Sequence, residues 1–168
     1  FVYLAALDKG YTPSTLILDA PFVGVQAPGL PLWKPKNYTN KFYGPSTMRV
    51  GVEQSRNLMT VRLASEIGMD SVVDYARKFG IMKDMPPHLS MALGAGETTL
   101  LDLTAAYAML VNGGKRITPT LIDSIQDRHG KTIQKHDTRT CEGCLVPWQD
   151  NLTAPELEDN REQVVNSA

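Results

Sequence analysis

A serine and an asparagine two positions apart, Ser55 and Asn57, have types and spacing that could do chemistry. A positioned hydroxyl can pass on a proton, and a carboxamide can donate a hydrogen bond to a reacting carbonyl. The triplet Ser-Arg-Asn stands between two segments with helical patterns, so both side chains could face one cleft. A simpler interpretation is that Ser55 caps the following helix and Asn57 satisfies a local turn. The triplet alone does not decide between these two interpretations.

A second group of candidate ligands lies in the last third of the chain. Cys141 and Cys144 have the spacing of a metal or redox pair, and His129 and His136 precede them. Two cysteines and two histidines can bind zinc tetrahedrally. A zinc-stabilised interaction module is therefore one hypothesis for this chain.

The composition is that of an ordinary globular protein. Of the 168 residues, 42% are hydrophobic and 21% charged, and 17 basic residues nearly balance 18 acidic ones. The formal net charge of -1 gives no electrostatic footprint for nucleic acid or for an anionic membrane. Apolar runs such as residues 1–7 are far shorter than the roughly 18 residues that a membrane helix needs. We therefore expect no nucleic-acid partner and no membrane-spanning segment within this chain.

Helical patterns dominate the first two thirds of the chain. Residues 1–9 predict a helix, which Gly10 ends in a left-handed cap. Proline then recurs too often for a helix, so residues 11–45 predict a long surface excursion with short extended pieces. Loops of this length are usually functional or variable.

Two helices are expected on either side of the triplet. The first opens at residues 45–47 and runs through about residue 54, and the second covers about residues 58–67. Gly68 ends the second helix, and Asp70 is placed to cap a third one. This part of the chain is predicted to be a compact group of short helices.

The most regular helical pattern begins where Thr99 is followed by Asp102, which resembles a capping box. An Asn-Gly-Gly sequence stops this helix. Residues 121–125 and 132–133 then flank a glycine-containing turn and predict a β-hairpin. From residue 135 onward the chain is polar and irregular, and no regular element is predicted there.

The order of these segments resembles the penicillin-binding transpeptidases, especially the bifunctional peptidoglycan synthases. The matching blocks are residues 1–7 (FVYLAAL), 43–49 (YGPSTMR), 53–57 (EQSRN), 61–64 (VRLA), 79–81 (FGI), 89–97 (LSMALGAGE), 105–108 (AAYA) and 112–116 (NGGKR). The first block resembles the segment directly after the family's Ser-x-x-Lys box, and the second and third together resemble the helix leading into its Ser-x-Asn motif. Several ordered blocks are more specific than one triplet, so the resemblance favours a catalytic role for Ser55 and Asn57.

The resemblance implies an α+β fold, the penicillin-binding transpeptidase or serine β-lactamase-like fold, present only in part. This chain would be mostly helical with one β-hairpin, and most of the main sheet would lie outside it. Both ends look like cuts, so residues 1–168 are interpreted as an internal fragment of one domain. Residues 1–134 would be its family-like core, and residues 135–168 an irregular tail.

Enzymes of this family attack a D-alanyl-D-alanine peptide with a serine, whose proton a nearby lysine takes, and then pass the acyl group to an amine of a second peptide. By the resemblance, Ser55 would relay a proton to the departing D-alanine amine. Asn57 would bind the substrate's acyl amide and orient the lysine. No serine here is followed three residues later by lysine, and no Lys-Thr-Gly sequence occurs. We expect the nucleophile just before Phe1, and no activity from the chain alone.

For the whole protein, the resemblance implies cross-linking of peptidoglycan stem peptides, covalent inhibition by β-lactam antibiotics and an additional glycosyltransferase domain. It would act at the periplasmic face of the bacterial inner membrane, anchored by residues outside this chain, without cofactor or metal. An oxidising periplasm favours a disulfide between Cys141 and Cys144 over a zinc site. A non-catalytic penicillin-binding-like scaffold and the zinc module remain alternative hypotheses.

Overall fold

The structure, a computed structural model, describes all residues except 26–28, 30, 142, 148, 156 and 167–168. The chain divides into two compact units, residues 1–103 and 104–168, and the division falls inside helix α5 (Leu100–Val111). Among the described residues, no helix combines the length and the apolar character that a membrane crossing requires.

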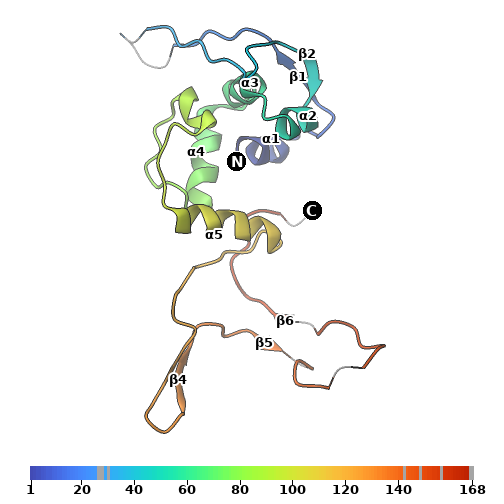
Figure 1. The fold of residues 1–168 in the computed structure, drawn as a ribbon, viewed down its shortest axis with the longest axis vertical. Helices are drawn as coiled ribbons and strands as arrows, with labels where there is room; N and C mark the ends of the chain where they lie inside the picture. The colour runs from blue at the N-terminus through green and yellow to red at the C-terminus, as the bar shows by residue number, and fades with distance from the viewer. Residues whose placement is uncertain (26–28, 30, 142, 148, 156, 167–168) are drawn as a thin grey trace. The chain divides into compact units, whose positions relative to one another are not determined.

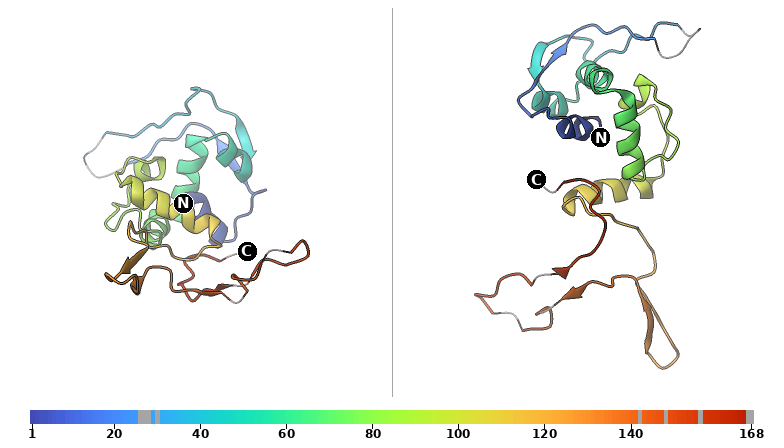
Figure 2. Two further views of the ribbon diagram at one scale, coloured as in Figure 1. Left: turned by 60° about the horizontal axis from the view of Figure 1, so that its bottom comes forward. Right: turned by 180° about the vertical axis from the view of Figure 1, so that it is seen from behind.

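The first unit is a group of short helices beside a two-stranded sheet (Figure 1). Its elements are α1 (Val2–Asp8), β1 (Leu16–Asp19), β2 (Gly44–Thr47), α2 (Met48–Glu53), α3 (Asn57–Ile67), α4 (Met69–Lys78) and the 3-10 helix η1 (Leu89–Leu93). Helix α3 contacts α1, α2, α4, η1 and β1, and Figure 2 shows it from two further sides. The helix that follows the Ser-Arg-Asn triplet is therefore the centre of this unit.

Helix α3 is central because apolar residues occupy most of its circumference. Its side chains Leu58, Met59, Val61, Leu63 and Ala64 are all 0% exposed. Full burial of one such large side chain contributes about 1.5–3 kcal/mol. Packing on several sides holds α3 firmly, so its first turn provides a fixed position for the triplet.

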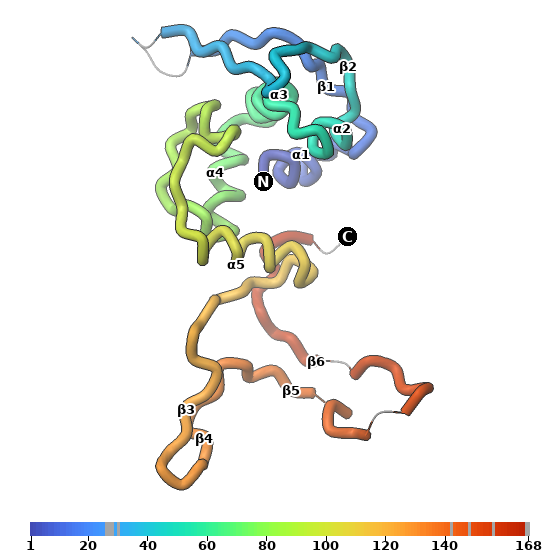
Figure 3. Tube along the Cα trace, viewed as in Figure 1, coloured from blue at the N-terminus to red at the C-terminus, as the bar shows by residue number. Residues whose placement is uncertain are grey.

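The two strands correct the expected start of helix α2. The sequence predicts that residues 45–47 open a helix, but Gly44–Thr47 form β2, which pairs antiparallel with β1 so that Asp19 lies opposite Gly44. The helix begins only at Met48, and Thr47 Oγ1 caps it by accepting the Val50 N–H at 3.4 Å. In Figure 3 the chain passes directly from β2 into α2. Pairing with a strand distant in sequence overrides the local helix signal.

The helices predicted from glycine stops are confirmed. Helix α1 ends before Gly10, whose φ is 87°, and α4 ends before Gly80, whose φ is 70°. The prediction that Asp70 caps α4 is wrong, because Gly68 occupies the N-cap position. Asp70 lies in the first turn instead, where its negative charge interacts favourably with the positive end of the helix dipole.

The predicted capping-box-like start of α5 is present. The Asp102 N–H donates to Thr99 Oγ1 at 3.1 Å, and the Thr99 hydroxyl donates to Asp102 Oδ2 at 2.7 Å. These two bonds satisfy one of the backbone N–H groups that a helix start leaves without an internal partner. They explain why α5 starts at Leu100.

The second unit contains the predicted hairpin, formed by β3 (Ser124–Gln126) and β4 (Thr132–Lys135). Its first strand starts later than expected, at Ser124 rather than at residue 121. The tail also contains a short pair, β5 (Thr140–Cys141) and β6 (Leu157–Glu158), where no regular element was expected. Two residues per strand give too little periodicity for a sequence pattern to detect.

Candidate active site

Ser55 lies in the turn between α2 and α3 with a left-handed backbone, φ 50°. Its N–H donates to Val52 O at 3.1 Å, and the Arg56 N–H donates to Gly51 O at 2.9 Å. These two bonds form a Schellman motif, which usually has glycine at the position that Ser55 occupies. A serine in this conformation costs on the order of 1 kcal/mol, and strain of this kind concentrates at functional sites. The backbone therefore points to a role for the Ser55 side chain.

The Ser55 hydroxyl does not cap helix α3. That helix begins at Asn57, has Arg56 at its N-cap position, and receives no hydrogen bond from the Arg56 side chain. Ser55 is exposed, and its hydroxyl has no hydrogen-bond partner among the described residues. The interpretation of Ser55 as a simple helix cap is therefore wrong.

Asn57 begins α3 and is half-buried. Its Nδ2 donates to Lys36 O at 2.9 Å, across 21 residues of sequence. The alternative in which Asn57 satisfies a local turn is therefore also wrong. A carboxamide has two N–H groups and an acceptor oxygen. A single bond to Lys36 leaves further hydrogen-bonding capacity for a ligand.

The first turn of α3 is capped by a residue of the proline-rich excursion. Asn37 Oδ1 accepts the Leu58 N–H at 3.2 Å. Asn37 Nδ2 donates to both carboxylate oxygens of Asp19, at 2.8 and 3.0 Å, and to Lys41 O at 2.9 Å. Asn37 is 4% exposed and Asp19 is 0% exposed. Sequence reasoning missed both residues, because their partners are too distant in sequence to form a local motif.

Arg56, the middle residue of the triplet, contacts the end of the same excursion. Its Cζ lies 3.4 Å from the ring centroid of Tyr43, and Tyr43 Oη lies 3.0 Å from Thr39 Oγ1. The hydrogen bond to Thr39 and then the Arg56 guanidinium lower the pKa of Tyr43 below its ordinary value. Within the described part of the chain, Arg56 Nε is buried without a hydrogen-bond partner.

Helices α1 and α3 run in the same direction. Tyr3 Oη lies 2.9 Å from Thr60 Oγ1, near the start of both helices, and Lys9 Nζ donates to Ile67 O at 2.6 Å, near both ends. The Thr60 hydroxyl in turn donates to Arg56 O at 3.0 Å. The start of α1 therefore lies at the same end of α3 as the Ser-Arg-Asn triplet.

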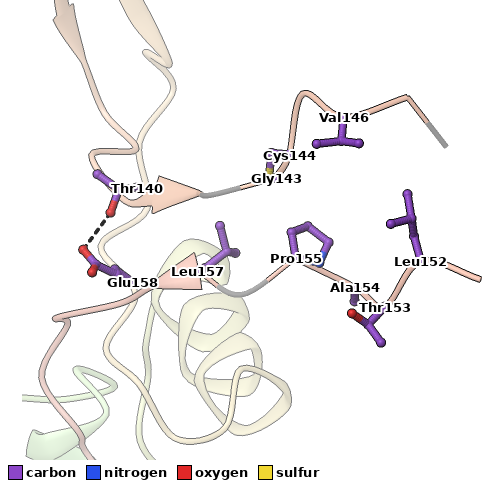
Figure 4. A pocket seen from close by; sticks show the side chains of 10 residues that line it. All are labelled: Thr140, Gly143, Cys144, Val146, Leu152, Thr153, Ala154, Pro155, Leu157 and Glu158. Carbon is purple, nitrogen blue, oxygen red and sulfur yellow. Dashed lines mark hydrogen bonds between the residues drawn. The ribbon is translucent and has the colours of Figure 1, made fainter. Parts of the chain in front are cut away.

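Two cavities have linings that include neither Ser55 nor Asn57. The one in Figure 4, of about 1090 Å³, is formed by the tail around β5 and β6, and its one lining carboxylate, Glu158, accepts a hydrogen bond from Thr140. A cavity of about 370 Å³ in the first unit is lined by apolar residues, glycines and one threonine, without an ionisable side chain. Neither cavity brings together a nucleophile and a base.

Cys141 and Cys144 are joined by a disulfide. No group of three or more His, Cys, Asp or Glu side chains suited to a metal ion occurs among the residues that the structure describes. The histidines His129 and His136 belong to the exposed hairpin region. The arrangement that a zinc module would need is therefore not assembled in the described residues.

Comparisons with known proteins agree with the sequence resemblance. The family model of the penicillin binding protein transpeptidase domain matches residues 1–145. Penicillin-binding protein 1A of Rickettsia bellii (strain RML369-C) is 49% identical over 150 residues, which are 89% of this chain and 19% of that protein. The chain thus spans about a fifth of the length of this relative.

Solved structures show the same fold. The crystal structure of penicillin-binding protein 1A from Haemophilus influenzae matches with a TM-score of 0.74 and 38% identity, over 80% of this chain and 20% of that chain. Penicillin-binding protein A from M. tuberculosis, solved as a penicillin G acyl-enzyme complex, matches with a TM-score of 0.69 over 99% of this chain and 38% of that chain. At 19% identity, the second match shows the fold alone. These matches confirm the predicted partial transpeptidase fold, and the chain belongs to the penicillin-binding protein transpeptidase family.

Proposed function

We propose that this chain is the part of a serine-type D-alanyl-D-alanine transpeptidase in which Ser55 and Asn57 act on the substrate. The observation that carries the proposal is the strained left-handed turn at Ser55, which presents an unpaired hydroxyl beside Asn57 in a chain of this family. The complete protein cross-links peptidoglycan stem peptides and is acylated by β-lactams.

The reaction has two acyl transfers. A serine Oγ attacks the carbonyl carbon between the two D-alanine residues, and its proton passes to a lysine. The C–N bond breaks, an acyl-enzyme ester forms, and Ser55 relays a proton to the departing D-alanine amine. An amine of a second peptide then attacks the ester carbon, forms the new amide and releases the serine, which regains its proton.

Asn57 has two tasks in this scheme. Its side chain donates a hydrogen bond to the acyl amide of the donor peptide, and it orients the lysine. A positioned donor or proton relay contributes about two to three orders of magnitude in rate. The half-buried side chain of Asn57 suits these tasks, because its bond to Lys36 O restricts its orientation.

The parallel packing of α1 and α3 supports a nucleophile just before Phe1. A Ser-x-x-Lys box at that position would enter the fold at the start of α1. That start lies at the same end of α3 as Ser55 and Asn57. The nucleophile, its lysine and the triplet would then meet at one end of two adjacent helices.

The wider proposal follows from the longer relatives. The complete protein acts at the periplasmic face of the bacterial inner membrane through an anchor outside this chain, and it carries a glycosyltransferase domain upstream. Further strands of the main sheet and the Lys-Thr-Gly motif come from residues outside this chain. The chain alone is therefore inactive.

Intact mass spectrometry after incubation with benzylpenicillin tests the proposal. We compare the 168-residue chain with the full-length natural protein that contains it. The full-length protein should gain one covalent adduct, mapped to a serine upstream of Phe1, and the chain alone should gain none. A folded full-length protein that takes no adduct would overturn the proposal in favour of a non-catalytic scaffold.

A further inference from the structure

We propose that Asp19 and Asn37 are positioning residues for the transpeptidase reaction. They hold the first turn of α3 and, through it, keep Ser55 and Asn57 in reactive geometry. This inference rests on the proposed function of Ser55 and Asn57. Asp19 and Asn37 belong to β1 and to the excursion, and both are almost fully buried.

The first turn of α3 needs an acceptor from outside the helix. The first N–H groups of a helix have no partner within it, and the N-cap side chain usually accepts one of them. Here the N-cap residue is Arg56, whose side chain has donors only. Asn37 Oδ1 takes its place by accepting the Leu58 N–H at 3.2 Å. The cap therefore comes from a separate segment of the chain.

Asp19 determines which way the Asn37 amide points. The amide nitrogen faces both Asp19 oxygens at 2.8 and 3.0 Å and also donates to Lys41 O at 2.9 Å. A flipped amide would place the Asn37 oxygen against a buried carboxylate and leave that carboxylate unpaired, which is unfavourable. The carboxylate therefore keeps the Asn37 oxygen directed at Leu58.

The adjacent residues Lys36 and Asn37 also hold Asn57 and the residue after it. Lys36 O accepts from Asn57 Nδ2 at 2.9 Å, and the next residue, Asn37, accepts from the Leu58 backbone. One short segment therefore fixes the side chain of Asn57 and the backbone that follows it. A shift of Asn37 would move both.

Arg62 ties helix α3 to the strand that carries Asp19. Its Nε donates to Leu18 O at 3.0 Å, and its Nη2 donates to Ala20 O at 3.4 Å and to Pro21 O at 3.2 Å, so two of its three acceptors flank Asp19 in sequence. The partner strand of β1 leads directly into α2. Both helices that flank Ser55 are thus attached to one two-stranded sheet, and the Asp19–Asn37 pair is the buried link of that attachment.

Acylation of the full-length protein by benzylpenicillin tests the inference, measured as the maximal acylation rate at saturating drug. Asn37→Asp keeps the acceptor for Leu58 but removes both donors and sets a second carboxylate against Asp19. Asp19→Asn keeps the size but removes the charge that orients the amide. Each variant should slow maximal acylation by about 10- to 100-fold, since small displacements of reacting groups have effects of this size.

The double variant Asp19→Asn with Asn37→Asp is the decisive measurement. It exchanges donor and acceptor, so one hydrogen bond re-forms within the pair while an oxygen at position 37 still accepts from Leu58. The double variant should be faster than Asn37→Asp, because both variants lack the donor to Lys41 O and only the double variant re-forms a hydrogen bond within the pair. Recovery by exchange is not expected if the two substitutions merely loosen the fold.

Tyr75→Phe is the matched control, because it removes a partly buried hydrogen bond between Tyr75 and Asp8 of the same unit, distant in sequence from the triplet. It should lower the melting temperature and leave the maximal rate of the folded protein unchanged. If Asn37→Asp does not fold, Asp19→Asn and the double variant still decide. Full rates in both would overturn the inference, as would a double variant no faster than a folded Asn37→Asp variant.

The proposed function fails in a different way. If the wild-type protein takes no drug, the transpeptidase assignment itself is wrong. If the wild type reacts and Ser55→Ala and Asn57→Ala are slow, the function stands. Normal rates in the Asp19 and Asn37 variants would then overturn only the positioning role.

Discussion

Arg56, the middle residue of the Ser-Arg-Asn triplet, stacks on the ring of Tyr43, with 3.4 Å between Arg56 Cζ and the Tyr43 ring centroid. The guanidinium lies over the negative face of the ring, which attracts a cation. Tyr43 comes just before β2, and Arg56 comes just after α2. The stack therefore joins the residue that precedes β2 to a residue that follows α2, and it fixes the end of the excursion to the triplet.

An alkaline titration should detect this stack. Because the bond to Thr39 and the Arg56 charge lower the pKa of Tyr43, a tyrosinate absorbance signal should appear below the ordinary range near pH 10. Tyr43→Phe should remove that early signal, and Arg56→Met should move it to higher pH. Tyr3 and Tyr75 should ionise late, because burial raises the pKa of each. An early signal that persists in Tyr43→Phe would contradict the assignment.

The lowered pKa of Tyr43 also determines how its contribution to stability changes with pH. A tyrosine whose folded-state pKa lies below its unfolded value holds fewer protons when folded, so its contribution to stability grows as pH rises between the two values. Tyr3 and Tyr75 act oppositely, since their contribution is complete below the unfolded pKa and is lost as pH rises toward the raised folded pKa. When pH rises between two alkaline values, the Tyr43 contribution to the free energy of unfolding, measured in urea as the difference between wild type and Tyr43→Phe, should therefore increase.

Replacing Ser55 by glycine should separate stability from activity. Glycine adopts a left-handed backbone without steric cost, so Ser55→Gly should stabilise the full-length protein by about 1 kcal/mol at most. It should also slow acylation by about 100-fold, because the proton relay is lost. Ser55→Ala is the control that loses the hydroxyl and keeps the backbone strain. A slower reaction with a lower melting temperature in Ser55→Gly would contradict this account of the turn.

Local patterns were sufficient for most of the α-helices. Regular apolar spacing, glycine stops and the Thr99–Asp102 box lie within a few residues of the elements they specify, and the structure bears out α1, α3 and α5. The misplaced start of α2 involves a distant partner. Residues 44–47 became a strand because β1 pairs with them, and this pairing left no local signal.

The sequence likewise predicted only part of the candidate site. Ser55 and Asn57 were predicted as site residues from the ordered family blocks around them, but the left-handed turn could not be predicted, since Schellman motifs are expected at glycine. Asn37 and Asp19 stayed hidden because a buried polar pair is defined by contacts rather than by spacing. Asn37 stands in an Asn-x-Thr sequence that suggests a surface position, whereas its side chain is buried.

Gly51 offers a test of the packing that supports the triplet. A Cβ added there would lie 2.9 Å from Tyr3 Oη and 3.0 Å from Met59 Cε. Glycine to alanine within a helix normally stabilises by about 0.5–1 kcal/mol, but overpacking costs about 1–3 kcal/mol. Gly51→Ala should therefore lower the melting temperature, because the rigid Tyr3 ring cannot move its hydroxyl aside easily.

The double variant Gly51→Ala with Tyr3→Phe should lose less stability than the two single changes added together, because the second change removes the crowding oxygen. Gly113→Ala is not a suitable control, since its φ of 65° is strained for alanine by itself. A rise in melting temperature for Gly51→Ala would show that α1 and α2 are packed more loosely than the structure describes.

The disulfide between Cys141 and Cys144 gives the test that separates the transpeptidase from a zinc module. Trypsin should release residues 140–161 as one peptide, because no lysine or arginine lies between Arg139 and Arg161. Without reduction this peptide should be lighter by two hydrogen atoms and unreactive toward a thiol reagent, and after reduction both cysteines should react. The purified full-length protein should retain no zinc through these cysteines, and Cys141→Ser should leave acylation unchanged because a local bridge in the tail has no part in the reaction. One equivalent of zinc that is lost on Cys141→Ser would instead favour the module.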